Sequence, residues 1–411
     1  MKQLSANVIG LGYIGLPTAA TLANANIDVT GIDINQNIVD TINQGNIHIT
    51  EHGLDILVRA AVQRKRLKAS TTIQMADIHI IAVPTPITKD KKADLSYVKE
   101  AAKTIASIIK PGDLVILEST VPPATCSNIV GPIIKEITAL DHKQDYYLAH
   151  CPERVIPGKI LNELINNDRI IGGTTPEATN KTAELYKLFV KGELLLTDAS
   201  TAEMCKLMEN TYRDVNIALA NELADIAEDI DIDIAEAIKL ANHHPRVNIH
   251  SPSIGVGGHC IPVDPWFIVD NAAEKSVLIR TAREINDARP SFFAGKILDY
   301  ARAYPNKQLA LLGLSYKADV DDLRESPAIE IVLDIAKRLK SNLLIVEPNI
   351  SKLPKELELT NLELVDLFTA IKKADKLIIL VPHSDFKSVS NNDSIVNIMD
   401  LETEQEKELS L

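Results

Sequence analysis

The chain contains 411 residues, of which 45% are hydrophobic and 24% charged, so it is long enough for two or three domains that each bury a core. Its formal net charge is −13 and no basic block stands out, which argues against a nucleic-acid partner, because binding phosphates requires a basic face. No signal peptide or bilayer-spanning apolar run is evident, and Cys126, Cys151, Cys205 and Cys260 form no CxxC pair. We therefore expect a cytoplasmic protein with free thiols, no membrane association and no metal site.

The first half of the chain alternates strand and helix patterns. Apolar strands are predicted at 7–10, 27–34, 79–83, 114–118 and 146–149, with helical stretches between them, the first at 17–24. This alternation predicts a parallel, doubly wound sheet covered on both faces. We assign it to a dinucleotide-binding domain over residues 1–198.

The pattern becomes helical after about residue 200. Met204, Leu207, Val215 and Leu219 recur at helical spacing without an intervening proline or glycine, which predicts a long helix that is either a plain core helix or buried between subunits. Further helices are predicted at 234–241 and 275–288, on either side of the proline- and glycine-rich segment 245–265. Residues 199–305 are therefore predicted to form a central helical domain.

A second α/β pattern begins near residue 306. Strands are predicted at 308–314, 342–346 and 376–381, with a helix at 328–339, while the acidic, polar end 401–411 is expected to fray. The predicted fold class is α/β, with two doubly wound Rossmann-like domains, 1–198 and 306–411, joined by the helical central domain.

A glycine turn opens the first helix. Gly10, Gly12 and Gly15 form GxGxxG directly after a strand, and Asp33 ends the next strand at about the spacing of an NAD-binding site. The glycines allow a tight turn and close approach to a pyrophosphate, and the carboxylate would bind the ribose hydroxyls and repel a 2′-phosphate. The 83–86 segment VPTP ends another strand at the same sheet edge, where such folds bind ligands.

Cys260 follows three glycines in GVGGHC, residues 255–260, a pattern that indicates close backbone approach to a ligand with a thiol presented at a turn. Asp264 lies four positions later and could orient a water or a partner. Most cysteines are small buried hydrophobes, and that alternative stays open for Cys260 on these grounds. Lys206 and Asn210 share one helix face; the lysine either extends to solvent or is held inward as a cation.

The whole set of motifs resembles the UDP-glucose/GDP-mannose dehydrogenase family over nearly the full chain, most closely its UDP-N-acetyl-D-mannosamine branch. The matching segments are GLGYIGLP (10–17), VPTP (83–86), ESTVPP (118–123), CPERVIPGK (151–159), AEMCKLMENTYRDVNIALANE (202–222), HPRVNIH (244–250), GVGGHCIPVDPWFIV (255–269) and GLSYKADVDDLRESP (313–327). The resemblance implies an NAD-dependent, four-electron oxidation of the C6 alcohol of a UDP-sugar to a carboxylate, through a thiohemiacetal and a thioester on Cys260.

The resemblance also implies roles for individual residues. Catalytic roles fall to Cys260, Lys206, Asn210, Asp264, Glu153 and Thr120, with Lys206 and Asn210 stabilising oxyanion character and the last three holding or deprotonating water. Cofactor contacts are expected from Gly10, Gly12, Tyr13, Ile14, Gly15, Asp33, Thr85, Thr120 and Arg324. Substrate contacts are expected from Glu153, Arg154, Val155, Lys206, Asn210, Arg246, Asn248, Gly257, Gly258 and Lys317.

The chain departs from UDP-glucose dehydrogenases at two positions, where Pro157 replaces an acidic residue and Arg154 an apolar one. Water activation therefore cannot depend on a second carboxylate at 157. UDP-N-acetylglucosamine or UDP-glucose stays open as the substrate, and a non-catalytic dinucleotide-binding regulator is the alternative of another class. A homodimer through the long helix is expected, because similar enzymes pair through that element.

Overall fold

The computed structural model describes residues 3–156, 158–339, 343–358, 362–389 and 394–401. The chain divides into two compact units, Met1–Glu209 with Trp266–Ala273, and Asn210–Pro265 with Glu274–Leu411. Two helices, α8 (Ala199–Asp229) and α10 (Asp264–Asn271), contribute residues to both units. Among the described residues, no helix is both long and apolar enough to cross a bilayer.

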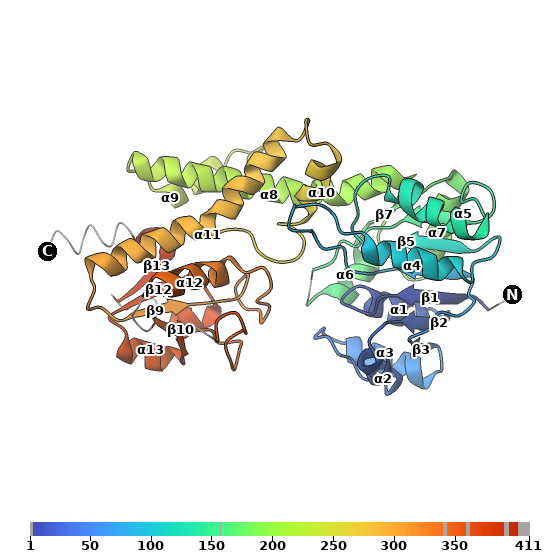
Figure 1. Ribbon diagram of the computed structural model, residues 1–411, viewed down its shortest axis with the longest axis horizontal. Coiled ribbons are helices and arrows are strands. Elements are labelled where there is room, and N and C mark those ends of the chain that lie inside the picture. The colour runs from blue at the N-terminus through green and yellow to red at the C-terminus, as the bar shows by residue number, and fades with distance from the viewer. Residues whose placement is uncertain (1–2, 157, 340–342, 359–361, 390–393, 402–411) are drawn as a thin grey trace. The chain divides into compact units, whose positions relative to one another are not determined.

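The first unit contains an eight-stranded sheet in the order β3-β2-β1-β4-β5-β6-β7-β8 (Figure 1). Its strands are β1 (Ser5–Ile9), β2 (Asp28–Ile32), β3 (Leu67–Ser70), β4 (Ile78–Ile81), β5 (Leu114–Leu117), β6 (Tyr147–His150), β7 (Arg169–Gly173) and β8 (Leu194–Asp198). The predicted doubly wound α/β architecture is confirmed for this sheet. The expectation that it is parallel throughout is wrong at one place, since β7 pairs antiparallel with β6. The connection 151–168 returns the chain at the same sheet edge, and β8 then continues parallel to β7.

Helices cover both faces of this sheet, as the buried strands at its centre, such as β4 and β5, require. One core includes side chains of α1 (Gly15–Asn24), α3 (Leu54–Gln63) and α7 (Pro176–Tyr186), and the other includes those of α4 (Ser96–Ala106) and α5 (Gly131–Thr138). Three shorter elements complete the unit: α2 (Gln36–Asn43), the π-helical turn η1 (Cys126–Val130) and α6 (Ile160–Asn166). The carboxyl ends of β1, β4, β5 and β6 all lie at one edge, where their loops carry the predicted site residues.

The predicted long helix is present as α8, and α9 (Ile234–Ala241) matches its prediction. The helix predicted at 275–288 is much longer, because α11 runs over Val277–Ala303 with Pro290 inside it. Proline normally interrupts a helix. Here the helix continues because Phe293, Ala294 and Ile297 beyond the proline are buried in the core of the second unit.

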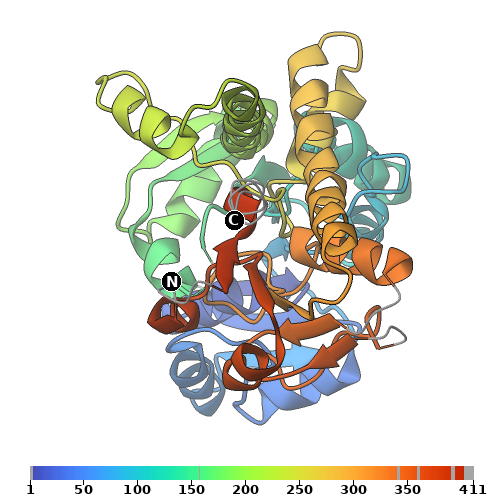
Figure 2. The same ribbon diagram turned by 90° about the vertical axis from the view of Figure 1, so that its left-hand side faces the viewer.

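A five-stranded parallel sheet forms the second unit's α/β part, in the order β11-β10-β9-β12-β13 (Figure 1). The strands are β9 (Leu309–Leu312), β10 (Leu343–Val346), β11 (Leu362–Leu364), β12 (Lys376–Ile379) and β13 (Ile395–Asn397). One face packs against α11 and α12 (Pro327–Arg338), which lie side by side in Figure 2, and the other against α13 (Leu367–Lys373) and the 3₁₀ turn η2 (Ser384–Val389). The last described turn, η3 (Ile398–Asp400), precedes a buried Leu401. The rest of the predicted frayed end, 402–411, lies outside the described residues.

Candidate active site

The three glycines of the turn after β1 differ in what surrounds their Cβ positions. Gly10 has φ +90°, and a Cβ there would lie 2.6 Å from the Ala82 carbonyl oxygen, while a Cβ on Gly15 would lie 1.8 Å from the Gly10 oxygen. Gly12 has nothing within 4 Å of its Cβ position, so open space lies before it. The outer glycines therefore permit the turn and the close helix–strand packing, and Gly12 leaves room for a ligand at the start of α1. Tyr13 and Ile14 complete the turn, with Tyr13 exposed.

Asp33 follows β2 and lies against this turn. Its Oδ2 accepts a hydrogen bond from the Leu11 backbone N–H at 3.1 Å, and its Oδ1 accepts one from Asn35 N–H at 2.9 Å. The side chain is only partly buried. The carboxylate is thus fixed beside the glycine turn, in the position where an NAD site places its ribose-binding acid.

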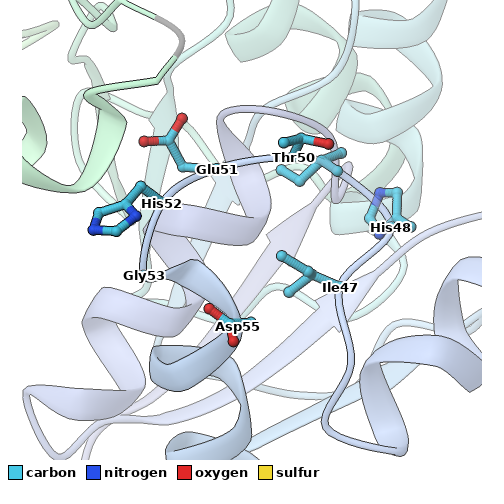
Figure 3. Close-up of a pocket in the computed structure, with 8 residues that line it drawn as sticks. Ile47, His48, Thr50, Glu51, His52, Gly53 and Asp55 are labelled. Atoms are coloured by element: carbon cyan, nitrogen blue, oxygen red, sulfur yellow. The ribbon is translucent and has the colours of Figure 1, made fainter.

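No motif pointed to the loop between α2 and α3, which lines a surface pocket with residues 47–53 and Asp55 (Figure 3). Partial burial lowers the pKa of His48 on this loop, and the nearby Asp33 carboxylate opposes that effect. Glu51 is buried and accepts hydrogen bonds from Gly158 N–H at 2.7 Å and Ile160 N–H at 2.9 Å. The loop therefore lies beside Asp33 and also holds the segment that follows Glu153.

Thr85 and Thr120 come together at the ends of β4 and β5. The Thr85 hydroxyl donates to the Thr120 carbonyl oxygen at 2.7 Å, and the Ser119 hydroxyl donates to the Val83 carbonyl at 2.7 Å. These bonds join the VPTP and ESTVPP segments at the sheet edge that carries the glycine turn.

Glu153 lies buried beyond β6 and is held from two sides. The Arg169 guanidinium donates to its Oε2 at 2.8 Å, and the backbone N–H of Arg154 donates to its Oε1 at 2.6 Å. The Arg154 side chain binds Glu209 through Nη2 at 2.8 Å and Nε at 3.1 Å. Val155 next to it is half-buried, and Pro157 lies outside the described residues. The structure thus directs the guanidinium of Arg154, a predicted substrate contact, toward α8.

Lys206 is partly buried on α8, one helical turn after the buried Glu203. The Glu203 carboxylate accepts a hydrogen bond from the Cys126 backbone N–H at 2.8 Å and so fastens α8 to the loop that follows Thr120. Cys126, His150 and Glu203 are all buried, with their donor atoms within 4.8 Å of one another. Burial lowers the pKa of His150 to about 3, so its ring is neutral, and nearby Lys206 adds to this effect. We interpret this cluster as the anchor of the α8 turn that carries Lys206.

In the second unit, Asn210 and Asp264 are both buried and joined by a hydrogen bond of 2.5 Å from Asn210 Nδ2 to Asp264 Oδ2. Asp264 begins α10, and its N–H and that of Val263 donate to the Cys260 carbonyl at 2.9 and 3.1 Å. These bonds close a turn on which the Cys260 thiol is exposed. The structure therefore brings together three of the predicted catalytic residues.

The glycine loop before Cys260 packs against the segment between β9 and α12. A Cβ on Gly257 would lie 2.6 Å from the Glu325 carbonyl oxygen, and one on Gly258, which has φ +88°, would lie 3.2 Å from the Tyr316 ring. Lys317 follows Tyr316 and is exposed. The close packing requires glycine at 257, and it brings the thiol-bearing loop next to the segment with the predicted nucleotide-sugar lysine.

The two remaining arginines are both exposed. Arg324 forms a two-point ion pair with Asp322, its Nε and Nη2 lying 2.8 and 2.7 Å from the carboxylate oxygens. Arg246 and Asn248 lie in a turn between α9 and α10, which Asn242 closes through two hydrogen bonds with the Ile249 backbone at 2.9 and 2.7 Å. Because Arg324 and Arg246 are exposed, both guanidinium groups are accessible for ligand binding.

The sequence matches the three domains that define the UDP-glucose/GDP-mannose dehydrogenase family. The NAD-binding domain matches residues 5–190, the central domain 200–288 and the UDP-binding domain 310–403. The chain belongs to this family. This membership confirms the resemblance that the motifs indicated. It also confirms that the protein is a dehydrogenase and that its cofactor is NAD.

Relatives of known name align with nearly the whole chain. An NDP-N-acetyl-D-galactosaminuronic acid dehydrogenase of Ralstonia solanacearum is 50% identical over 94% of this chain and 92% of its own. A UDP-N-acetyl-D-mannosamine dehydrogenase of Campylobacter jejuni is also 50% identical, over 94% and 97%. The solved structure of the UDP-D-ManNAc dehydrogenase of Pyrococcus horikoshii superimposes with a TM-score of 0.86 at 41% identity, covering 96% of this chain and 94% of that one.

Proposed function

We propose that this dehydrogenase oxidises the C6 alcohol of UDP-N-acetyl-D-mannosamine to a carboxylate, with Cys260 as covalent nucleophile. The observation that carries the proposal is the turn at Cys260, where the cysteine is exposed and its backbone carbonyl is bonded to Asp264, whose side chain binds Asn210. A binding module would have no use for an exposed cysteine on a turn built from such polar residues, so a non-catalytic regulator is the weaker alternative.

The glycine turn and Asp33 of the first unit would hold the cofactor. Gly12 leaves open space at the start of α1, where backbone N–H groups suit a pyrophosphate, and Asp33 would accept hydrogen bonds from the adenosine ribose. When bound, NAD accepts a hydride in each of the two oxidations. Tyr13, Ile14, Thr85, Thr120 and Arg324 are the further contacts that the family resemblance implies.

The protein's own groups would carry the covalent steps. The Cys260 thiolate adds to the C6 aldehyde carbon, and the oxygen of the resulting thiohemiacetal lies with Lys206 and Asn210, whose cationic and amide donors stabilise its negative charge. After the second oxidation, water attacks the thioester carbon, the C–S bond breaks, and the sulfur leaves as the thiolate. Glu153, Thr120 and Asp264 would hold this water and take its proton.

Substrate recognition would fall to the residues that the family resemblance implies. Arg154, Val155, Glu153, Lys206 and Asn210 would surround the sugar, in line with the family resemblance. Lys317 would bind the nucleotide-sugar, Gly257 and Gly258 would lie against it, and Arg246 and Asn248 would complete the site. The exposure of Lys317, Arg246 and Asn248 supports their assignments. The ion pair of Arg154 with Glu209 orients its guanidinium, which distinguishes this site from one with an apolar residue there.

The sugar itself is the part of the proposal that comes from the relatives. UDP-N-acetyl-D-galactosamine is a second candidate, because the galactosaminuronic acid enzyme of Ralstonia is as similar to this chain as the mannosamine enzyme of Campylobacter. Steady-state kcat/KM with the UDP derivatives of N-acetylmannosamine, N-acetylgalactosamine, N-acetylglucosamine and glucose separates them. The proposal predicts the highest value for N-acetylmannosamine, and a higher value for any other sugar would overturn the choice.

We also propose the three-domain division 1–198, 199–305 and 306–411, a homodimer, and a role in the cytoplasm. The spacing of the family's three domains along the sequence supports the division. In the part of the chain that the structure describes, the four cysteines form no disulfide, as is typical of proteins in reducing compartments. Exposed apolar side chains on α8, among them Met208, Leu219 and Ile226, support a helix-mediated dimer.

A further inference from the structure

A cluster of charged side chains lies buried in the first unit next to Glu153, and none of the sequence motifs explains it. Its centre is Arg169, the first residue of β7, which is 4% exposed. Glu118 at the end of β5 and Tyr186 at the end of α7 are each 1% exposed. A buried guanidinium is costly unless its charge is compensated, so its partners indicate what it does.

Arg169 contacts two carboxylates unequally. Its Nη2 lies 2.8 Å from Glu153 Oε2, whereas its Nη1 lies 3.9 Å from Glu118 Oε1. Nη1 also lies 3.5 Å from the Cys151 sulfur, and the guanidinium carbon lies 5.0 Å from the centre of the Tyr186 ring. The short contact is therefore with Glu153, and Glu118 is the more distant competitor for the same cation.

Glu118 has its own hydrogen-bond donors. The Tyr186 hydroxyl donates to Oε1, and the Thr18 hydroxyl on α1 donates to Oε2 at 3.2 Å. Thr18 lies one turn after the last glycine of the dinucleotide motif. The cluster thus connects the helix at the NAD site with the strand ends that carry Thr120 and Glu153.

The protonation of Glu118 changes the charge around Arg169. Burial raises the pKa of Glu118 to about 7, with Arg169 opposing this effect and Glu153 adding to it. The pKa values of Cys151 and Tyr186 are also raised by burial, so both stay neutral near pH 7. With Glu118 protonated, the guanidinium is balanced by Glu153 alone. With Glu118 ionised, two carboxylates share one cation.

We propose that Arg169 is the positioning residue for Glu153, and that Glu118 competes for the same guanidinium whenever it is ionised. When Glu118 is protonated, the Arg169 guanidinium pairs with Glu153 alone and holds the Glu153 carboxylate in one orientation. Ionised Glu118 draws the guanidinium away and loosens Glu153. This inference rests on the proposed function, in which Glu153 holds the water that opens the Cys260 thioester.

The test measures thioester hydrolysis across pH in the intact enzyme, by quenching single turnovers and comparing protein-bound sugar with free acid. In the wild type, the rate of thioester hydrolysis should fall as the pH rises through about 7. This inflection should come in addition to the titrations of other groups. In Glu118→Gln, which keeps a neutral hydrogen-bonding side chain, this inflection should disappear. In Tyr186→Phe, which removes a hydrogen bond that favours ionised Glu118, it should move to higher pH.

Arg169→Lys keeps the charge but loses the planar fork, so hydrolysis should slow by about tenfold or more, with the KM for NAD unchanged. Arg66→Lys is a matched control, because Arg66 forms its ion pair with Asp28 at a partly exposed position beside β3. That control should hydrolyse the thioester with the wild-type pH profile.

A spectroscopic readout keeps the inference testable if Arg169→Lys does not fold. The infrared difference spectrum of the wild type between pH 5 and 9 should contain a buried carboxylic acid C=O band that is absent from Glu118→Gln. Unchanged hydrolysis profiles in Glu118→Gln and Tyr186→Phe would overturn the inference while leaving the proposed function intact. If the wild type formed no acid or thioester, the proposed function itself would fail.

Discussion

Cys260 is reactive in this account because of where the chain places it. Its thiol is exposed, whereas Cys126 and Cys151 are buried, and burial raises the pKa of both of those thiols. A thiolate is the nucleophilic form, so the two buried cysteines are poor candidates. The backbone bonds from Val263 and Asp264 fix the turn that presents the sulfur.

Replacing Cys260 with serine should abolish acid formation, by at least about a thousandfold, because an unactivated hydroxyl is a much weaker nucleophile than a thiolate. NAD affinity should stay within about twofold of wild type, since the proposed cofactor contacts come chiefly from the first unit. Cys205→Ser provides the control for loss of a thiol. Acid production at the wild-type rate by Cys260→Ser would remove the covalent mechanism.

In the proposed function Asp33 has two roles, and one substitution removes both. Asp33→Ala should weaken NAD binding by about tenfold or more and reduce discrimination against NADP, because the ribose acceptor and the repulsion of a 2′-phosphate are both lost. Asp28→Ala, at the other end of β2, is the matched control. Titration calorimetry with both cofactors measures the change, and an unaltered NAD affinity would show that the ribose assignment is wrong.

The protonation of Glu118 should also make the free energy of unfolding depend on pH. Its pKa in the folded protein, about 7, exceeds the ordinary value of 4.5, so the folded state binds the proton more tightly than the unfolded state. The resulting stabilisation is complete below about pH 4.5 and is lost as the pH rises through 7. Between about pH 4.5 and 7, the free energy of unfolding of the wild type should therefore fall by up to about 3 kcal/mol relative to that of Glu118→Gln. Urea unfolding at a series of pH values measures it, and a constant difference would contradict the buried, titrating state.

At the scale of elements, α8 and α11 are joined by a buried polar ladder within the second unit. Arg283 pairs with Asp214, and Asn286 donates to the Asp214 carboxylate at 2.9 Å and accepts from Asn221 at 2.9 Å. Asn221 in turn accepts from Ser253 N–H at 2.8 Å. The ladder therefore fixes the register of the two helices and holds the segment that leads into the glycine loop.

Arg283→Met should destabilise the folded protein by about 3–5 kcal/mol, because it leaves the Asp214 carboxylate buried without its cation. The double variant with Asp214→Leu should recover most of that loss, since it removes the uncompensated charge. Arg302→Met, whose exposed pair with Asp299 lies on the same helix, should have little effect. Denaturant unfolding compares the three, and equal stability of Arg283→Met and Arg302→Met would contradict a structural role for the ladder.

At the scale of the whole molecule, the sequence predicted what local chemistry determines. The glycine turn, the strands before it and the long helix follow from spacing and hydrophobic pattern, and the structure contains them near the expected bounds. Strand β7 was not predicted, and its antiparallel direction depends on how the chain returns after β6, which leaves no periodic signal. The length of α11 was missed because burial in the second core outweighs the local effect of Pro290.

The supporting residues of the site could not be predicted for a related reason. Glu51 caps a segment more than a hundred positions away, Glu203 binds Cys126, and Arg169 meets both Glu118 and Glu153. Such partners meet only through the fold, and isolated acidic or basic residues in a sequence are usually solvated. Glu118 and Glu203 lie within the matching segments 118–123 and 202–222, but nothing local in those segments identifies their partners.

The proposed reaction is a four-electron oxidation that ends in a carboxylate. Its most direct test is to count the NADH formed per UDP-N-acetyl-D-mannosamine consumed while identifying the sugar product by mass spectrometry. The proposed reaction yields two NADH per sugar and the C6 acid as the product. One NADH per sugar, with an aldehyde or ketone released, would contradict it.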